Sequence, residues 1–408
     1  MDLSPHSTEP TGSASHHHVV VVGGGTAGIS VAARLRRAGV GDIAVLDPSD
    51  THWYQPLWTL VGGGQAPLET SRRSEESLIP DGVRWIRDSA VAVDPDARTV
   101  SVAGGGRIGY DYLVLAPGLQ LDWDKVPGLA KAIGRDGVTS NYASEYAPYT
   151  WELIKGMRSG TAVFSHPATP LKCGGAPQKI AYLAADYWRK QGVLDSIRIV
   201  FVLPDPKLFK VPVWTKALEK VVERYGIEVR YESEVTAVDG SARELTVTDL
   251  KTGTEEVLAY DMAHLVPPQS APDWVKASPL AEGPYGFVKV DKHTLRSPDH
   301  PEIFALGDVA NLPTSKTGAA VRKQSPVVVE HLVAAMKGAE AGARYDGYTS
   351  CPLVTARDKM LLAEFDYDLK PKSSFPLINT FKERRDMWVF KRYVLPVIYW
   401  RGMMSGRV

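Results

Sequence analysis

Two short apolar runs near the start of the chain lie on either side of a helix-compatible stretch. Val19 to Val22 is a run of four valines, and Ile43 to Leu46 is a second apolar run. Continuous β-branched runs of this length are typical of strands that are buried on both faces, as in a parallel sheet. The residues between the runs, up to Arg37, have a helical pattern. This segment therefore predicts a β-α-β unit.

The same alternation recurs later and predicts a second α/β unit. Strands are predicted at Tyr112 to Ala116, Thr161 to Ser165 and Ile197 to Leu203, and a helix at Pro177 to Lys190. Another strand, Glu302 to Leu306, precedes a helical segment from Gly318 to Met336. Because proline interrupts helices, Pro326 is expected to kink that segment or to mark its true start.

This order of elements predicts an α/β protein with two Rossmann-like dinucleotide-binding domains and a C-terminal appendage that interacts with a membrane. Residues 16–120 and 290–345 would form the first, discontinuous domain, and residues 121–289 the second. Residues 1–15 are expected to be a disordered leader. Residues 346–408 would form the C-terminal segment.

A glycine-rich loop follows the first predicted strand. Gly23, Gly25 and Gly28 have the spacing G-x-G-x-x-G, with Thr26 and Ala27 between them. Glycines at these positions allow a tight turn and bring the backbone close to a pyrophosphate at the helix N-terminus. Asp47 ends the second strand, where it can accept hydrogen bonds from an adenosine ribose. Strand, glycines, helix, strand and acid in this order predict a dinucleotide site.

The late strand that ends in Gly307-Asp308 indicates that this dinucleotide is FAD. In flavoproteins with two dinucleotide-binding domains, an Asp at this place accepts a hydrogen bond from the ribityl chain, and the next helix directs its positive N-terminus at the flavin. Asp308 would hold the ribityl chain. Lys316, Thr317, Gly318 and Ala319 would lie beside the isoalloxazine, and the predicted cofactor contacts also include Gln55, Val91 and Pro117.

The second α/β unit lacks the glycine fingerprint that NADH binding requires. After Phe164-Ser165 the chain continues with prolines and Cys173 at the place of a nicotinamide-binding loop. Hydride donation from NADH is therefore not expected, and another electron donor is required.

The composition is that of an ordinary globular protein, with 408 residues, 44% hydrophobic and 23% charged. Lys+Arg and Asp+Glu are both 47, so no nucleic-acid partner is expected. The first residues lack the basic and apolar pattern of a targeting segment, which indicates a reducing, cytosolic-side location. The histidines at 16–18 are expected to lead into the first strand.

Cys173 and Cys351 are the only cysteines of the chain. They lack metal-ligand spacing, so no metal site is predicted. On spacing alone they are two unrelated buried thiols. However, Cys173 lies between Lys172 and Lys179 just before a predicted helix, which favours the thiolate. If both cysteines meet on one flavin face, their Cα–Cα distance should suit a disulfide or a short polysulfide bridge, which in a reducing compartment would be catalytic.

Four segments resemble the sulfide:quinone oxidoreductases, in particular the eukaryotic-type branch that includes the mitochondrial enzyme. They are Tyr54 to Gly62, Leu171 to Lys179, Asn311 to Thr317 and Tyr345 to Thr355, and the resemblance extends from the first strand to about Tyr367. The third cysteine of the bacterial-type enzymes is absent, which fits this branch.

The resemblance implies that hydrogen sulfide attacks a Cys173–Cys351 bridge at Cys351 and leaves a persulfide there. Cys173 would be released as a thiolate beside the flavin and pass two electrons to FAD, which reduces a quinone. A sulfur acceptor (sulfite, a thiol or sulfide itself) would remove the sulfane sulfur. The alternatives are a type II NADH:quinone oxidoreductase and a non-catalytic flavoprotein that senses persulfide or redox state.

The segment from Met387 to Arg401 mixes aromatic residues with cations, and its longest uncharged run is too short to span a bilayer. We expect it to lie in the membrane interface, with Lys391, Arg392 and Arg401 toward phosphates. The alternative is a packing segment or the interface of a homodimer. Candidates for the quinone pocket are Phe365, Phe381 and Trp388. Together these features predict a peripheral protein on the cytoplasmic face of a bacterial cell membrane.

Overall fold

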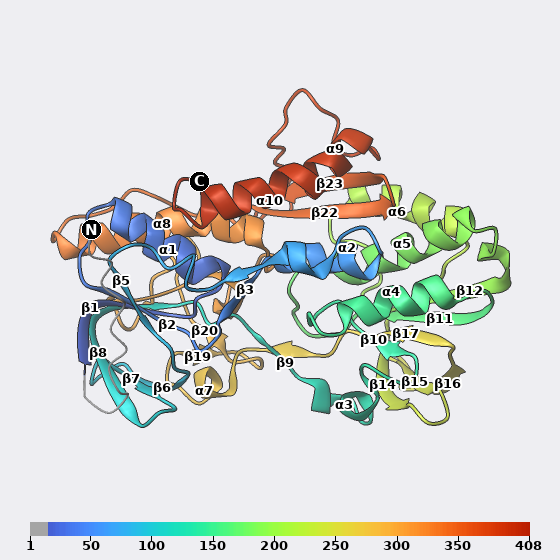
Figure 1. The fold of residues 1–408 in the computed structure, drawn as a ribbon, viewed down its shortest axis with the longest axis horizontal. Helices are drawn as coiled ribbons and strands as arrows, with labels where there is room; N and C mark the ends of the chain where they lie inside the picture. Colours follow the sequence, from blue (N-terminus) through green and yellow to red (C-terminus); the bar gives the residue numbers. More distant parts are fainter. Residues whose placement is uncertain (1–14) are drawn as a thin grey trace, which may run out of the picture.

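The computed structural model of the protein describes residues 15–408, and these form two lobes along the longest axis of the molecule (Figure 1). Each lobe contains a parallel sheet, and a C-terminal helix lies across both lobes. The predicted leader falls outside the described residues apart from Ser15, which begins the first strand.

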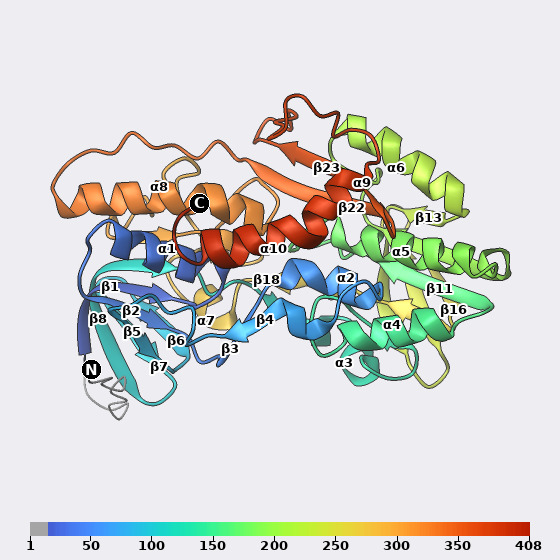
Figure 2. The ribbon, with the colours of Figure 1, turned by 45° about the horizontal axis from the view of Figure 1, so that its top comes forward.

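The first lobe contains a seven-stranded sheet whose parallel part has β1 at its centre. The strand order is β5-β2-β1-β8-β7-β6, with β21 also paired to β8. These strands are β1 (Ser15–Val22), β2 (Ile43–Leu46), β5 (Val83–Ile86), β6 (Ala90–Asp94), β7 (Thr99–Val102), β8 (Gly106–Leu115) and β21 (Ile303–Ala305). Helices α1 (Thr26–Arg37) and α8 (Gly318–Met336) lie together on one side of this sheet (Figure 2).

Strand β1 is buried on both faces, as its four valines predict. Val19 and Val21 pack in one apolar core, while Val20 and Val22 pack in another on the opposite side of the sheet. In the register of the sheet, Val22 lies between Leu46 of β2 and Leu115 of β8. The chain leaves all three strands at the same edge, which brings their following loops together.

The second lobe repeats the alternation of strands and helices. Its parallel sheet has the order β10-β17-β11-β12-β13. A small antiparallel sheet lies beside it and consists of β14 (Ser233–Asp239), β15 (Glu244–Asp249) and β16 (Glu255–Ala259). The parallel strands and the helices between them are β10 (Val138–Thr139), β11 (Gly160–Ser165), α5 (Ala176–Lys190), β12 (Ile197–Leu203), α6 (Pro212–Tyr225), β13 (Glu228–Tyr231) and β17 (Met262–His264). The predicted class, an α/β protein with two Rossmann-like units, is therefore confirmed.

The chain crosses between the lobes at β9 (Gln120–Leu121) and β18 (Gln269–Ser270), which pair with each other. After the second crossing, Ala271, Val275 and Leu280 already pack in the core of the first lobe. These three residues lie inside the range 121–289 that the sequence assigned to the second domain. The domain boundaries themselves stay a prediction.

The C-terminal segment consists of a hairpin and a long helix. The hairpin strands are β22 (Thr349–Ala356) and β23 (Lys359–Phe365). The helix runs through α9 (Arg385–Val389), η6 (Phe390–Val394), α10 (Leu395–Val397) and η7 (Ile398–Met403), of which η6 and η7 are π-helical. It extends from the β22–β23 hairpin to α1 (Figures 1 and 2).

The π-helical turns set which side of this helix faces the protein. The buried positions Met387, Lys391, Tyr399 and Met403 are separated by multiples of four residues. An α-helix has about 3.6 residues per turn, and π-turns have more, so alternating the two keeps such positions on one face. The opposite face carries the exposed apolar residues Val389, Tyr393, Val394 and Val397.

Candidate active site

The glycine-rich loop has the close packing that its sequence predicts. Gly23 has φ +102°, and a Cβ there would lie 2.9 Å from the Cα of Pro117, two residues after the end of β8. A Cβ on Gly28 would collide with the carbonyl oxygen of Gly23. By contrast, a Cβ on Gly25 would meet nothing within 4 Å. The loop is therefore closed toward the protein and open in front of the N-terminus of α1.

The carboxylate of Asp47 fixes the same loop from the end of β2. Its Oδ2 accepts a hydrogen bond from the Gly24 amide at 2.6 Å, and its Oδ1 accepts one from the Ser49 amide at 2.8 Å. Each carboxylate oxygen can accept a second bond, so contact with a ribose hydroxyl is compatible with this arrangement.

The second predicted flavin segment lies directly against the glycine loop. Gly307, with φ +73°, follows β21, and a Cβ there would be 3.2 Å from the Cβ of Ala27 in α1. Burial raises the pKa of the neighbouring Asp308 above its usual range. The Lys316 ammonium donates to the carbonyl oxygens of Asp308 at 2.6 Å and Ala310 at 3.0 Å, and burial lowers its pKa to about 8.

The N-terminus of α8 begins just after Lys316. Thr317 is its N-cap, and its Oγ1 accepts a hydrogen bond from the Ala320 amide at 3.1 Å. Helix α8 starts at Gly318, so Pro326 lies inside the helix and does not mark its start. The same Thr317 hydroxyl is 2.9 Å from the Thr349 hydroxyl on β22. This contact connects the predicted flavin helix to the strand that carries Cys351.

Most of the predicted cofactor residues lie in one connected region. Gln55 reaches it through its Oε1, which accepts a hydrogen bond from the Lys172 ammonium at 2.7 Å. Val91 is different: it lies on β6, two strands beyond β8 in the sheet, with 46% of its surface exposed. Its assignment as a cofactor contact stays a prediction.

The two cysteines lie next to each other. Their Sγ atoms are 3.7 Å apart, and neither is in a disulfide. This separation exceeds the roughly 2.05 Å of a disulfide bond, so the structure is that of a dithiol pair in contact. Cys173 precedes α5 and has φ +51°, a left-handed conformation, whereas Cys351 lies within β22. The backbone amide of Cys173 donates a hydrogen bond to the Lys316 carbonyl at 2.9 Å, which connects Cys173 to the segment before α8.

Gly175 makes the approach of the two sulfurs possible. A Cβ on Gly175 would lie 2.5 Å from the Cys351 sulfur and 2.5 Å from the Leu353 side chain. At Gly174 a Cβ would meet nothing within 4 Å. Only the second glycine is therefore required for contact between the cysteines.

The electrostatic surroundings make the two thiols unequal. A hydrogen bond from the Cys351 thiol and the Lys179 ammonium, which is 3.1 Å from the Cys173 sulfur, hold the pKa of Cys173 well below its usual range. The hydrogen bond to Cys173, burial and repulsion by the neighbouring thiolate raise the pKa of Cys351. Cys173 is therefore the more acidic of the two thiols.

Lys391 of the C-terminal helix lies close enough to the cysteine pair to interact with it electrostatically. Its side chain is buried, and its ammonium donates to the Pro56 carbonyl at 3.2 Å. Burial, reinforced by the charge of Lys179, lowers the pKa of Lys391 to about 7. The expectation that Lys391 points toward membrane phosphates is wrong. That expectation is based on composition, which predicts that every cation of such a helix lies at the surface. Of the three cations, only Arg401 is exposed.

Several further polar residues near the site had no motif by which to find them. His52, Glu75 and Tyr399 form a buried hydrogen-bonded group beside the glycine loop. Glu75 keeps one buried oxygen, Oε1, without a protein partner. Such an unpaired oxygen, the open space at Gly25 and the half-buried Asp308 and Lys316 fit a dinucleotide at this loop.

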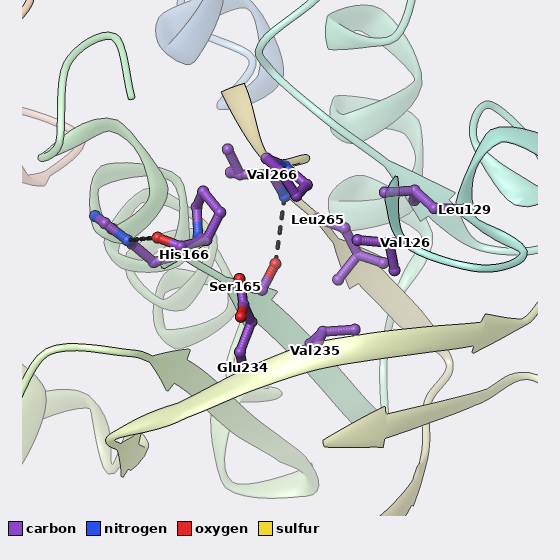
Figure 3. Close-up of a pocket in the computed structure, with 10 residues that line it drawn as sticks. Val126, Leu129, Ser165, His166, Glu234, Val235, Leu265 and Val266 are labelled. Carbon is purple, nitrogen blue, oxygen red and sulfur yellow. Dashed lines mark hydrogen bonds between the residues drawn. The ribbon is translucent and has the colours of Figure 1, made fainter. Parts of the chain in front are cut away.

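The equivalent position in the second lobe offers little space. At the carboxyl end of β11, a cavity of about 10 Å³ is lined by Ser165, His166, Glu234 and Leu265, among others (Figure 3). A volume of this size holds about one water molecule. This cavity is therefore far too small for a nicotinamide nucleotide.

The aromatic residues considered for a quinone pocket lie in two places. Phe365 and Phe381 both pack on Trp214 of α6, with ring centroids 6.3 and 5.4 Å away. Trp388 lies on the C-terminal helix, 6.3 Å from Tyr393. Their role at a quinone pocket stays a prediction.

Residues 15–408 offer neither a membrane-spanning helix nor a metal-binding cluster. No helix in it is long and apolar enough to cross a bilayer. No cluster of three or more histidine, cysteine or acidic side chains in it is arranged to hold a metal ion.

Comparison with known proteins identifies the class first. Residues 17–339 match the family model described as pyridine nucleotide-disulphide oxidoreductase. The chain belongs to this family, and within it to the sulfide:quinone oxidoreductases, as the resemblance predicted. It is a flavin-dependent enzyme of sulfide oxidation and quinone reduction.

The relatives that carry this assignment align over nearly the whole chain. The mitochondrial sulfide:quinone oxidoreductase of Dictyostelium discoideum is 42% identical over 386 residues, 94% of this chain and 85% of the relative. The mitochondrial enzyme of Mus musculus is 40% identical over 394 residues, 96% and 87% of the two chains. The solved structure of the Aquifex aeolicus sulfide:quinone oxidoreductase, at 21% identity, has the same fold, with a TM-score of 0.81 over 96% of this chain and 92% of that one.

These relatives also correct one expectation. The predicted location on the cytoplasmic face of a bacterial cell membrane is contradicted, because the relatives at 40% and 42% identity are named as mitochondrial enzymes. The prediction combines the polar first residues with the short uncharged run of the C-terminal segment, and neither feature carries a positive signal for any compartment.

Proposed function

We propose that sulfide is oxidised at a Cys173–Cys351 pair, with Cys351 as the residue that carries the persulfide. The observation that supports this most directly is the 3.7 Å contact between the two sulfurs. A small movement closes such a contact to a disulfide. Both cysteines are next to the segments predicted to hold the flavin.

The chemistry starts from the disulfide form. Hydrosulfide attacks the Cys351 sulfur, the disulfide breaks, and its bonding electron pair leaves with Cys173 as a thiolate. Cys351 then carries the new S–S bond as a persulfide. Attack at Cys351 is favoured because the sulfur with the lower pKa is the better leaving group, and Lys179 lowers the pKa of Cys173.

The cycle closes by two further steps. A sulfur acceptor, for which sulfite, a thiol and sulfide are the candidates, takes the sulfane sulfur and leaves Cys351 as a thiolate. The two thiolates then reform the disulfide and release two electrons. A flavin held at this site would supply the two-electron acceptor between the cysteines and a quinone.

We propose FAD as the flavin, held by both halves of the first lobe. The glycine loop with Gly23, Gly25 and Gly28 would bind the pyrophosphate, and Asp47 the ribose. Asp308 would hold the ribityl chain, as the closeness of Gly307 to α1 supports. The remaining contacts are proposed at Thr26, Ala27, Gln55, Val91, Pro117, Lys316, Thr317, Gly318 and Ala319.

The exposed side of the C-terminal helix supports attachment to a membrane surface. Val389, Tyr393 and Val397 form a stripe on it, each 46–57% exposed. Leu377, in the loop before the helix, is 98% exposed. Exposed apolar side chains at this density are typical of a helix that lies in the interface, where a quinone would be within reach. The alternative is that a second copy of this chain covers the same face in a homodimer.

The decisive experiment uses Cys173→Ser and Cys351→Ser in the full chain. Under anaerobic mixing with sulfide, each variant should lose flavin bleaching by at least about a thousandfold, as expected for removal of a group that forms the covalent intermediate. FAD should stay bound in both. A variant that retains normal turnover would overturn the relay.

Two controls separate the competing functions. NADH in place of sulfide should not bleach the flavin, and rapid bleaching would support a type II NADH:quinone oxidoreductase. Steady sulfide-dependent quinone reduction over many turnovers should also be observed. A single bleaching event without turnover would instead support a redox sensor.

A further inference from the structure

The C-terminal helix makes a buried polar contact with the glycine loop. The Tyr399 hydroxyl is 2.8 Å from the Thr26 hydroxyl and 2.5 Å from Nε2 of His52. Tyr399 and His52 are each 3% exposed. Thr26 is the first residue of α1, within the predicted pyrophosphate site. A residue near the end of the chain thus touches the loop that begins the fold.

The direction of these hydrogen bonds follows from what each group can do. His52 Nδ1 lies 3.0 Å from the Gly24 carbonyl oxygen, which can only accept, so Nδ1 carries the proton. The same nitrogen is 3.1 Å from Glu75 Oε2. In the neutral ring Nε2 is then an acceptor, so Tyr399 donates to it, and the Thr26 hydroxyl donates to Tyr399.

This chain of bonds fixes the glycine loop at two points. The Gly24 carbonyl is held by His52, and the Thr26 side chain by Tyr399, while Asp47 holds the Gly24 amide. The loop amides that face the open space at Gly25 are therefore positioned by residues outside the β-α-β unit. Preorganised amides bind an anionic group more tightly than mobile ones, because less freedom is lost on binding.

The same end of the helix is packed on the strand that leads to Gln55. The Tyr399 ring lies against Tyr54, with centroids 4.3 Å apart. The next residue, Trp400, has the Arg73 guanidinium 4.8 Å from its ring centroid. Because Tyr399 is held by rings as well as by its hydroxyl, removing the hydroxyl alone leaves most of the packing in place.

We propose that Tyr399 is a positioning residue for the dinucleotide cofactor, and that through it the docking of the C-terminal helix and the binding of FAD stabilise each other. This inference rests on the proposed FAD site but not on the sulfide relay. Coupling of two binding events is reciprocal. A docked helix should therefore slow the loss of FAD, and bound FAD should hold the helix in place.

The first test compares Tyr399→Phe with Tyr393→Phe in the full-length holoenzyme. Tyr393 lies on the exposed side of the same helix and is 57% exposed, so its variant is a matched control. FAD release after dilution, followed by flavin fluorescence, should be about tenfold faster in Tyr399→Phe, because two buried hydrogen bonds to the loop region are lost. The control should release FAD at the wild-type rate. Equal rates in all three proteins would overturn the inference.

The second test can be decided on the wild-type protein alone. Trypsin cleavage after Arg392 and Arg401 reports opening of the helix. Cleavage in the wild-type protein should be about tenfold slower with FAD bound than after FAD is stripped, by the reciprocity of the coupling. In Tyr399→Phe this dependence on FAD should be largely lost. Identical wild-type cleavage with and without FAD would contradict the inference even if the variant failed to fold.

These outcomes are distinguishable from a failure of the proposed function. Both tests are made without sulfide, so a wrong assignment of Cys173 or Cys351 leaves them unchanged. A protein that bound no FAD at all would instead refute the cofactor assignment itself.

Discussion

The Lys179 ammonium lies 3.1 Å from the sulfur of Cys173. Cys173 lies in the turn just before helix α5, and Lys179 lies in the first turn of that helix. The lysine is 3% exposed, so water screens its charge little. This contact, rather than the bond between the thiols alone, breaks the symmetry of the cysteine pair. It makes Cys173 the group that leaves as a thiolate.

Replacing Lys179 by Met should raise the pKa of Cys173. Loss of a cation at this range typically shifts a pKa by about one unit or more, so the pH at which half of Cys173 is a thiolate should rise by about one unit. The rate of Cys173 alkylation by iodoacetamide, measured against pH in the reduced protein, reports this shift directly. Lys190→Met, further along α5, is the control because its ammonium pairs with Asp186 at 3.0 Å. An unchanged alkylation profile in Lys179→Met would mean that Cys351 alone sets the pKa.

Gly175→Ala should separate the cysteines. The new methyl group would occupy the space 2.5 Å from the Cys351 sulfur, so one of the two must move. We expect sulfide-dependent flavin reduction to fall at least about tenfold, because misplacement of reacting atoms by about 1 Å is enough for such losses. Gly174→Ala adds the same methyl group to open space and should react normally. If both variants reacted alike, the close approach at Gly175 would not matter to the chemistry.

Lys391 should make the stability of the fold depend on pH above neutrality. Its folded pKa is about 7, well below that of an unfolded lysine. Between these two values the unfolded chain binds one proton more, so the free energy of unfolding should rise with pH by about 1.4 kcal/mol per unit from this side chain. Below pH 7 both states are protonated and the contribution is constant, at its least favourable.

The comparison of wild type with Lys391→Met isolates this effect. Denaturant unfolding at pH 7 and pH 9 should give a difference between the two proteins that changes with pH, with the variant gaining relative stability at the lower pH. Other titrating groups contribute to both proteins and cancel. A difference that is the same at both pH values would show that Lys391 keeps an ordinary pKa.

Val397→Glu should weaken attachment to lipid vesicles. Val397 is 52% exposed on the outer side of the C-terminal helix, so the change should leave the fold intact. The variant loses one apolar side chain that would enter the membrane and gains a charge. Vesicle binding, measured by flotation, should therefore fall about tenfold or more. Val257→Glu is the matched control, since Val257 is 62% exposed on the β14-β15-β16 sheet. Equal flotation of both variants would place the membrane contact elsewhere.

The sequence allowed the parallel sheets and the helices between them to be predicted closely. Ile43 to Leu46 and Ile197 to Leu203 coincide with β2 and β12, and the predicted helix at Gly318 to Met336 coincides with α8. The two strands are almost wholly buried, so their apolar runs are continuous, and α8 is a long and largely apolar segment. The glycine loop and Gly307 were likewise found because only glycine suits the close packing there.

The polar residues of the site could not be predicted in the same way. His52, Glu75, Lys391 and Tyr399 come from four separate segments, and no spacing in the chain connects them. Lys391 was assigned to the wrong environment because a single cation among aromatic residues has no local signal for burial. Lys391 faces the protein because π-turns keep positions four residues apart on one side of the helix, and π-turns have no sequence signature of their own.

The C-terminal helix also imposes a condition on chain length. Tyr399, which contacts the glycine loop, lies eight positions after Lys391, which lies near the cysteine pair. Eight positions correspond to about 12 Å along a helix. Inserting or deleting one residue between them would rotate one contact away while the other held. The length of this helix segment must therefore match the distance between the cysteine pair and the proposed pyrophosphate site. Substitution of individual residues, however extensive, would leave this constraint undetected.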